Sequence, residues 1–376
     1  MSKPIYLDYN ATTPHDPEVI AAMRPHLEEV FGNPSSGHWY GAQPREAVIQ
    51  ARRQVASLLD CRPDEIVFTS GGTESNNHAV KGVANAYRHK GNHIITSRIE
   101  HPAILEVCRH LEGDGFEVTY LPVEGQGMVR AADVAAAITP ATILITIMHA
   151  NNEVGTVQPI AEISELAQKH DILLHTDAAQ SLGKIPAEVD TLGVDLLSIA
   201  GHKIYAPKGI GALYIRTGVK LAEFMHGAGQ ESGWRAGTEN VLEIAGLGKA
   251  CEIARRDLVN NGNHMQAMRD RLYEGLKENC GKVRLNGHPH QRLPNTLSLS
   301  FYDREANRIL ENISPEIAAS AGAACHSDTV EVSHVLEAMN VPVTWAKGTL
   351  RLTTGRHTTA EEIDRAIEVI SEAVRR

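Results

Sequence analysis

The chain has 376 residues, of which 42% are hydrophobic and 22% are charged, as in an ordinary globular protein long enough for two domains. Its formal net charge of −10 gives no electrostatic footprint for nucleic acid. No apolar run approaches the roughly 18 residues of a membrane-spanning helix. We therefore expect neither nucleic acid nor a membrane among its direct partners.

Short apolar runs alternate with helix-period segments through the first part of the chain. Seven runs predict strands, at residues 66–69, 93–96, 118–121, 143–148, 172–175, 196–200 and 210–215. Helical patterns, such as those at 79–87 and 160–167, lie between several of them. This alternation indicates an α/β fold with a mainly parallel sheet covered by helices on both faces. The last strand is a candidate for antiparallel pairing.

The pattern changes after residue 241. Apolar periodicity from 247 to 276 predicts one long helix or two helices in sequence, with an Asn-Asn-Gly-Asn cluster at 260–263 as the candidate interruption. Strands are expected at 297–301 and 349–352, and a capping box formed by Thr359 and Glu362 opens a final helix. We predict a large α/β domain at 15–259 and a smaller α+β domain made of 1–14 and 260–376.

The five cysteines are widely spaced and include no Cys-x-x-Cys pair. This spacing argues for a reducing compartment and against a disulfide framework or a structural zinc site. Residues 1–8 lack the apolar segment of a secretory signal. We expect a cytoplasmic protein without a bound metal.

Polar residues follow several predicted strands, at the edge where open α/β sheets bind ligands. Gly72 and Thr73 lead from the first strand into a helix, where backbone N–H groups and a hydroxyl could form a phosphate cup. Glu100 and His101 follow the second strand, and His101 could stack on an aromatic cofactor or transfer protons. Asn152 follows the fourth strand and could orient ring substituents. Taken singly, each of these residues is equally typical of an ordinary turn.

Three further residues decide between these interpretations. Asp177 and Gln180 follow the fifth predicted strand, and Lys203 follows the sixth, a buried run that ends in His-Lys. A carboxylate at a strand end suits the pyridinium nitrogen of pyridoxal 5′-phosphate (PLP), and a desolvated lysine forms the Schiff base that holds PLP. Together the strand ends predict a PLP site.

The chain resembles the cysteine desulfurase group of the class V aminotransferase family, and within that group the selenocysteine lyases. The resemblance rests on stretches that run nearly end to end: YLDYNATTP at 6–14, FGNPSS at 31–36, TSGGTESN at 69–76, EH at 100–101, HANNE at 149–153, HTDAAQ at 175–180, GHKIY at 201–205, RAGTEN at 235–240, AGAACHSD at 321–328 and LRL at 350–352. It implies a PLP-dependent transferase of fold type I, which forms a homodimer with its active sites at the dimer interface.

The resemblance also implies a role for each residue around the cofactor ring. Lys203 would hold PLP as a Schiff base, and Asp177 would pair with the pyridinium nitrogen. His101 would stack on the ring and take part in proton transfer. Gln180 and Asn152 would contact the ring oxygen and the substrate.

Other residues would bind the charged ends of cofactor and substrate. The resemblance places Gly72, Thr73 and His202 at the phosphate, with Thr238 reaching across from the other subunit. Arg351 would clamp the substrate carboxylate, which suits its planar, bidentate side chain.

Cys325 indicates that the predicted PLP enzyme acts on sulfur. Small residues at 321–324 and polar residues at 326–328 flank it, which favours a presented thiol over a core cysteine. The family mechanism implies that L-cysteine becomes alanine while Cys325 receives the sulfur as a persulfide. The persulfide then passes to an acceptor, such as an iron–sulfur scaffold protein. The other four cysteines are expected to be structural.

Ala200 leaves a second activity open. Many cysteine desulfurases have a phosphate-binding serine at this position, two residues before the His-Lys pair. An apolar residue there, together with the GAACHSD stretch, is typical of selenocysteine lyases, which release selenium from L-selenocysteine. Cysteine desulfurase is the prediction, and selenocysteine lyase is the alternative.

Two other classes of protein compete with these. A plain aminotransferase or carbon–carbon lyase on the same fold would use Lys203 and Arg351 but not Cys325. A catalytically inactive scaffold for sulfur-pathway partners would need a broken site, whereas the core positions of the expected site are all occupied.

Overall fold

The computed structural model describes residues 3–326 and 329–375. Its largest sheet has seven strands in the order β2, β8, β7, β6, β5, β3, β4. Their bounds are Ile66–Thr69, Gly211–Ile215, Leu196–Ala200, Leu173–Asp177, Thr142–Thr146, His93–Ser97 and Glu117–Leu121. β8 is antiparallel to both of its neighbours, and the other pairs are parallel. The predicted mainly parallel sheet is confirmed, with the last strand antiparallel.

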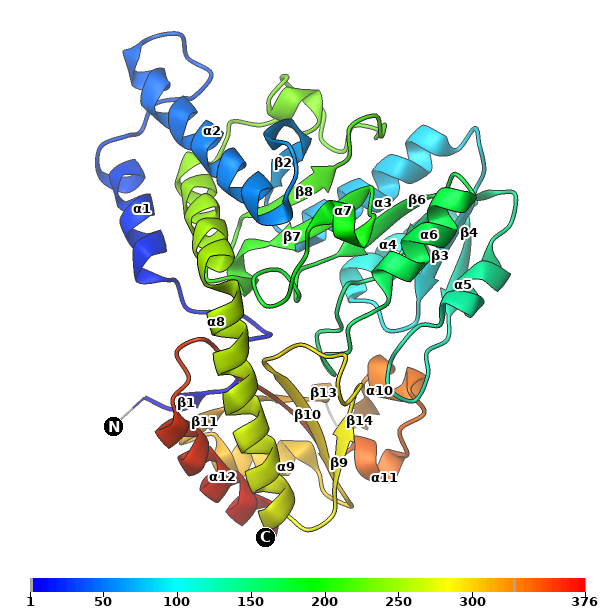
Figure 1. Cartoon of the computed structure of the whole chain (residues 1–376), viewed down its shortest axis with the longest axis vertical. Coiled ribbons are helices and arrows are strands. Elements are labelled where there is room, and N and C mark those ends of the chain that lie inside the picture. Colours follow the sequence, from blue (N-terminus) through cyan, green and yellow to red (C-terminus); the bar gives the residue numbers. More distant parts are fainter. Residues whose placement is uncertain (1–2, 327–328, 376) are drawn as a thin grey trace.

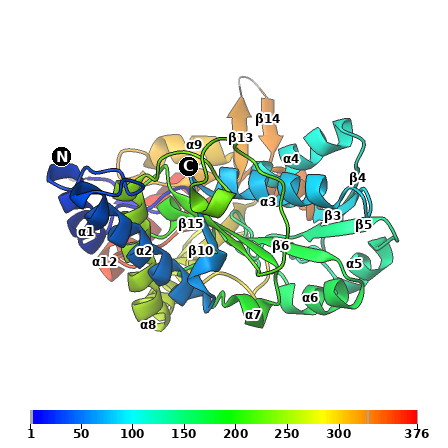
Figure 2. The same ribbon diagram turned by 90° about the horizontal axis from the view of Figure 1, so that it is seen from above.

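Both faces of this sheet are covered by helices because both faces are apolar (Figures 1 and 2). Adjacent residues such as Ile94 and Ile95 belong to separate apolar clusters, as strand geometry requires. One face packs on α3 (Gly72–Tyr87) and α4 (Pro102–Gly113). The other packs on helices with the bounds Trp39–Leu59 (α2), Ala131–Ala137 (α5), Ile160–Lys169 (α6) and Val189–Leu192 (α7).

The longest helix, α8 (Val241–Asn279), joins the two halves of the molecule (Figure 1). Leu247 and Cys251 pack in the core under the large sheet, whereas Leu272 and Leu276 pack in the C-terminal core. The Asn-Asn-Gly-Asn cluster does not interrupt it, because the turns on either side are anchored in these two cores. Of the two predicted possibilities, a single helix is correct. The predicted boundary at 259/260 falls inside α8, so the domain division remains a prediction.

The C-terminal half is built on an antiparallel sheet in the order β12, β15, β10, β9. The bounds of these strands are Ser320–Ala321, Thr349–Thr353, Thr296–Phe301 and Val283–Asn286. The helices α9 (Ala306–Ile313) and α12 (Ala360–Arg375) pack on it around a leucine- and isoleucine-rich core. The predicted capping box opens α12: Thr359 N donates to Glu362 Oε2 at 2.9 Å, and Glu362 N donates to Thr359 Oγ1 at 3.2 Å.

The N-terminal residues belong to this half, as expected. β1 (Ile5–Tyr6) pairs in parallel with β11 (Ile317–Ala318), and Leu7 is buried in the C-terminal core. α1 (Pro17–Glu28) then leads back to the large sheet. Short helices complete the chain: α10 (His334–Ala338), α11 (Val343–Ala346) and the 3-10 turns η1 (Pro63–Glu65), η2 (Gly201–Lys203) and η3 (Glu231–Gly233).

A separate hairpin of β13 (Ala323–His326) and β14 (Thr329–Val332) extends away from the rest of the fold in Figure 2. Among the described residues, no helix is long and apolar enough to cross a membrane.

Candidate active site

A cavity of about 340 Å³ lies where strands of the large sheet end and the N-terminal segment crosses them. Ten residues expected from the sequence line it: Gly72, Thr73, His101, Asn152, Asp177, Gln180, Ala200, His202, Lys203 and Arg351. Its volume falls within the range of about 300–1,000 Å³ that is typical of small-molecule sites. The structure therefore brings these residues from six separate segments into one place.

Lys203 lies on η2, the turn directly after β7. Gly201 makes this turn possible, because a Cβ there would lie 2.9 Å from the backbone oxygen of Ile210. Lys203 Nζ donates to the backbone oxygens of Asn10 at 2.5 Å and Ala11 at 2.8 Å. Burial, and then the nearby Arg351 cation, lower the pKa of Lys203 to about 8. A useful fraction of the amine is thus neutral and nucleophilic near neutral pH.

Asp177 ends β6 and is 6% exposed. Its carboxylate accepts from Asn76 Nδ2 at 2.7 Å and from the backbone N of Ala179 at 2.9 Å. These donors hold both oxygens in place. The sequence did not single out Asn76, although it stands within the quoted TSGGTESN stretch.

His101 is the N-cap of α4, where its Nδ1 accepts from the backbone N of Ala103 at 3.1 Å. Nδ1 is therefore the unprotonated nitrogen of the neutral ring, and Nε2 carries the proton. Desolvation lowers the pKa of His101, while the Asp177 carboxylate opposes that shift. The preceding residue, Glu100, is fully buried; it accepts from Ser97 Oγ at 2.6 Å and from the backbone N of Met148.

The opposite end of the cavity is rich in hydrogen-bond donors. Gly71, with φ +147°, turns the chain into α3, so the free N–H groups of the helix start and the Thr73 hydroxyl lie together. The His202 ring lies here, with Nδ1 3.2 Å from Thr12 Oγ1, and burial lowers its pKa to about 4. A Cβ on Gly72 would meet the Ala200 methyl at 3.2 Å, so these two small residues line the same wall.

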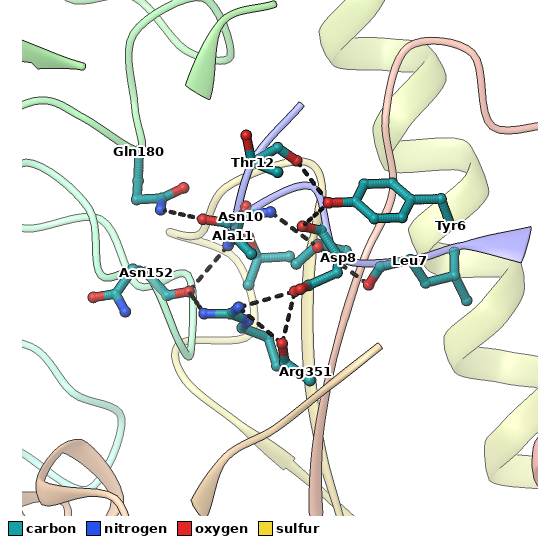
Figure 3. Close-up of polar contacts among 12 residues, drawn as sticks. Tyr6, Leu7, Asp8, Asn10, Ala11, Thr12, Asn152, Gln180 and Arg351 are labelled. Carbon is teal, nitrogen blue, oxygen red and sulfur yellow. Dashed lines mark hydrogen bonds and ion pairs between the residues drawn. The ribbon is translucent and has the colours of Figure 1, made fainter. Parts of the chain in front are cut away.

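Arg351, on β15, forms the side of the cavity nearest the C-terminal sheet (Figure 3). Its Nη2 donates to Asp8 Oδ1 at 2.9 Å and to Ser320 Oγ at 3.2 Å, and its Nη1 to the backbone oxygen of Asn152 at 3.3 Å. Nε is buried without a partner. The guanidinium is thus held in place by three neighbouring groups, and the residue lines the cavity.

Asn10 connects these parts and was missed from the sequence, although it belongs to the quoted YLDYNATTP stretch (Figure 3). Its backbone oxygen accepts from Lys203 Nζ and from Gln180 Nε2 at 3.0 Å. Its side chain donates to the backbone oxygen of Asn152 at 3.1 Å and to Thr296 Oγ1 at 2.9 Å. Only the fold brings these partners together.

The residues present fit PLP on their own chemistry. A fixed carboxylate, a lysine with a lowered pKa and a cup of phosphate donors lie around one cavity of suitable volume. In this arrangement Asp177 would face the ring nitrogen, Lys203 the aldehyde carbon, and the start of α3 the phosphate.

Two further predicted residues, Thr238 and Cys325, belong to other segments of the chain. Thr238 is exposed and does not line the cavity. Cys325 lies in β13, opposite Val330 of β14. Its side chain, like the backbone of residues 327 and 328, lies outside the part of the chain that the structure describes.

Both ends of the Cys325 hairpin are nevertheless fastened beside the cavity. Before the hairpin, Ser320 contacts Arg351. After it, Ser333 Oγ donates to Glu153 Oε2, and His334 Nε2 donates to the backbone oxygen of Glu100 at 3.0 Å. Cys325 is five positions after Ser320, a reach of at most about 18 Å. The hairpin that carries Cys325 therefore begins and ends beside the cavity.

The other four cysteines are unsuited to sulfur chemistry. Burial raises the pKa of Cys61, Cys108 and Cys251 to about 12 and also raises that of Cys280. Thiols that stay protonated are poor nucleophiles.

Residues 5–366 match the family described as Aminotransferase class-V, and the chain belongs to this family. Among its curated relatives, a cysteine desulfurase IscS from Dictyoglomus turgidum is 49% identical over all of this chain and 95% of that protein. Another, from Methanosarcina thermophila, is 50% identical over all of this chain and 93% of that protein.

Solved structures agree with these relatives. A NifS-like protein superimposes with a TM-score of 0.93 at 38% identity, over 98% of this chain and 99% of that one. SspA in complex with cysteine superimposes with a TM-score of 0.83 at 39% identity, over 94% of this chain and all of that one. The expected PLP-dependent transferase fold is confirmed.

Proposed function

We propose that this protein is a PLP-dependent cysteine desulfurase that converts L-cysteine to L-alanine and carries the sulfur as a persulfide on Cys325. The observation that carries the proposal is the position of the Cys325 hairpin. Its two ends are fastened to Arg351 and to Glu153, beside a cavity that also holds Lys203 and Asp177. The relatives named as cysteine desulfurases and the neighbour with bound cysteine support the same activity.

The cavity can orient an amino acid by its carboxylate. Arg351 lines the cavity, and its contacts with Asp8, Ser320 and Asn152 hold the guanidinium in one orientation. Asn152 lines the cavity next to Arg351. A carboxylate held there leaves the α-carbon toward Lys203 and the sulfur free to face the Cys325 hairpin.

PLP, when bound, would withdraw electrons from the α-carbon and so make its proton acidic. Lys203, with a pKa of about 8, and His101, with its neutral ring, are the groups placed to take and return protons. Asp177 would keep the cofactor nitrogen protonated through its charge. Gln180 and Asn152 would contact the ring oxygen and the substrate.

The sulfur step balances without an added oxidant. The Cys325 thiolate attacks the substrate sulfur, an S–S bond forms, and the C–S bond of the substrate breaks. The β-carbon of the substrate keeps the electron pair of the broken C–S bond and gains a proton, which gives alanine. The sulfur of Cys325 and the transferred sulfur together form the persulfide.

The decisive test follows alanine release from L-cysteine by the PLP-loaded protein, with wild type and Cys325→Ala compared. We expect the wild type to turn over and Cys325→Ala to lose at least about a hundredfold while it still binds PLP. Unchanged turnover by Cys325→Ala in the presence of a persulfide acceptor would favour an aminotransferase or carbon–carbon lyase instead.

Ala200 favours selenocysteine lyase as the second candidate activity. It lines the cavity against Gly72 and supplies no hydroxyl to the phosphate cup. The same assay with L-selenocysteine separates the two: much alanine from L-selenocysteine and negligible alanine from L-cysteine would replace the proposal.

We also propose a homodimer. Phe31, before α2, and Trp39 and Tyr40, at its start, are 79%, 69% and 55% exposed, and aromatic residues are enriched at interfaces. Thr238, exposed and away from its own cavity, would then contribute to the partner's phosphate cup. Sedimentation of the wild type against Trp39→Glu tests this, since the charge should shift the protein toward monomer.

The remaining proposals concern context. We propose a sulfur-acceptor protein, such as an iron–sulfur scaffold, as the partner, and the cytoplasm as the location, since a persulfide carrier requires reduced thiols. We retain residues 15–259 as the cofactor domain and 1–14 with 260–376 as the domain that carries the Cys325 hairpin, because each range has its own sheet and apolar core.

A further inference from the structure

A second lysine, Lys184, is buried behind the cofactor site and has no part in the mechanism above. It lies in the segment after β6 and is 7% exposed. Its Nζ donates to Gln180 Oε1 at 3.0 Å and to Asn10 Oδ1 at 3.3 Å. Both acceptors are neutral amides, and within the described part of the chain Lys184 forms no ion pair. Burial of an ammonium without a carboxylate is costly.

The charges that face Lys184 increase this cost. Its pKa is lowered to about 7 by burial first and then by the cations Lys203 and Arg351. A cavity of about 20 Å³, enough for roughly one water, lies between the two lysines and is also lined by Tyr9, Tyr205 and Arg356. Lys184 is thus directly behind the lysine that binds the cofactor.

The hydrogen bonds of Lys184 determine which end of the Gln180 amide faces the site. Lys184 Nζ is the donor in its contact with Gln180, so the amide turns its oxygen toward Lys184. Gln180 Nε2 then points the other way and donates to the backbone oxygen of Asn10 at 3.0 Å. That same oxygen accepts from Lys203 Nζ. The amide NH₂ group therefore lies on the Lys203 side.

Resting on the proposed function, we propose that Lys184 is a positioning residue that holds the Gln180 oxygen, so that Gln180 presents its NH₂ group to the ring oxygen of bound PLP. A donor at that oxygen stabilises its negative charge and weakens its hold on the proton shared with the Lys203 nitrogen. The proton then leaves at lower pH. Without Lys184, only the backbone oxygen of Asn10 holds the amide in this orientation.

The test is a pH titration of the visible band of the PLP-loaded protein, at about 420 nm. Lys184→Met keeps the length of the side chain and removes its donors, and should raise the midpoint by about half to one pH unit. Lys184→Gln retains an N–H donor and should recover most of the wild-type midpoint. Lys169→Met, at an exposed position on α6, is the charge-matched control and should leave it unchanged.

A double-mutant cycle shows whether Lys184 acts through Gln180. In a Gln180→Ala background, Lys184→Met should move the midpoint by much less than it does in wild type. An equal shift in both backgrounds would mean that the ammonium acts through space, which would overturn the proposal. Thermal unfolding of each apo-protein identifies variants that do not fold, and Lys184→Ala replaces Lys184→Met if the latter fails.

The two proposals fail in different ways. A wild type that forms no visible band with PLP, or releases no alanine from L-cysteine, overturns the proposed function and the role of Lys184 with it. A wild type that does both, together with folded Lys184 variants whose midpoints match wild type, overturns only the role of Lys184.

Discussion

The two sides of the cavity are built differently. On the cofactor side, Asp177, Lys203 and Arg351 are each fixed by two or more hydrogen bonds. The Cys325 strand, in contrast, pairs only with β14 among the described strands and is fastened at its two ends. A cofactor site needs fixed geometry, whereas a thiol that must meet both a substrate and an acceptor needs access to both.

Removal of Lys203 should abolish covalent binding of the cofactor on the fixed side of the cavity. Lys203→Ala lacks the amine that bonds PLP, so we expect the visible band to disappear and alanine formation from L-cysteine to fall at least about a thousandfold. Absorbance spectra and an alanine assay check this. Turnover that stays within tenfold of wild type would mean that another amine carries the cofactor.

The lowered pKa of Lys203 predicts how PLP uptake by the apo-protein depends on pH. The neutral amine is the nucleophile, so the uptake rate should rise about tenfold from pH 7 to 9 and level off above a midpoint of about 8. Stopped-flow absorbance measures the rate. A rate that keeps rising toward pH 10 would show an ordinary lysine.

A substitution at the base of the Cys325 hairpin should lower turnover without loss of cofactor binding. Ser333→Ala removes the hydroxyl that donates to Glu153, at the end of β14. We expect alanine turnover to fall about fivefold, or about 1 kcal/mol, with the PLP band unchanged. Ser314→Ala, exposed at the end of α9, is the matched control. Equal losses in band and turnover would contradict the separation of the two sides.

The smallest expected effect concerns the buried carboxyl next to His101. Burial raises the pKa of Glu100 from 4.5 to about 8. Between these values the folded protein binds a proton that the unfolded chain has released, so its stability falls as pH rises toward 8 and levels off above it. Relative to Glu100→Gln, the wild type should lose about 1 kcal/mol of unfolding free energy between pH 7 and 8, measured by urea unfolding. Parallel pH profiles would contradict this.

The sheet and much of the candidate site could be predicted because their signals are local. Apolar runs bounded by turns identify strands such as Leu196–Ala200, and polar residues at their ends converge by sheet geometry alone. Asn10 and Lys184 could not be found this way. Asn10 bonds Thr296 and Lys184, which both lie far away in the sequence, and no local pattern marks these contacts.

The same distinction applies to α8. Local propensity at residues 260–263 favours a break in α8. The helix is nevertheless continuous, because its two ends pack in separate cores. Propensity costs of about 1 kcal/mol for a glycine are small beside the burial of several leucines.

The crossing of the N-terminal segment has a consequence for synthesis on the ribosome. Asn10, whose carbonyl holds Lys203, is itself held by Thr353, 343 positions further along. The large sheet can form as the chain emerges, yet the segment that completes the lysine's surroundings must wait until β15 has been translated. Capture of the cofactor in its final geometry is thereby coupled to near-complete translation, so a chain stalled before β15 would lack the assembled site.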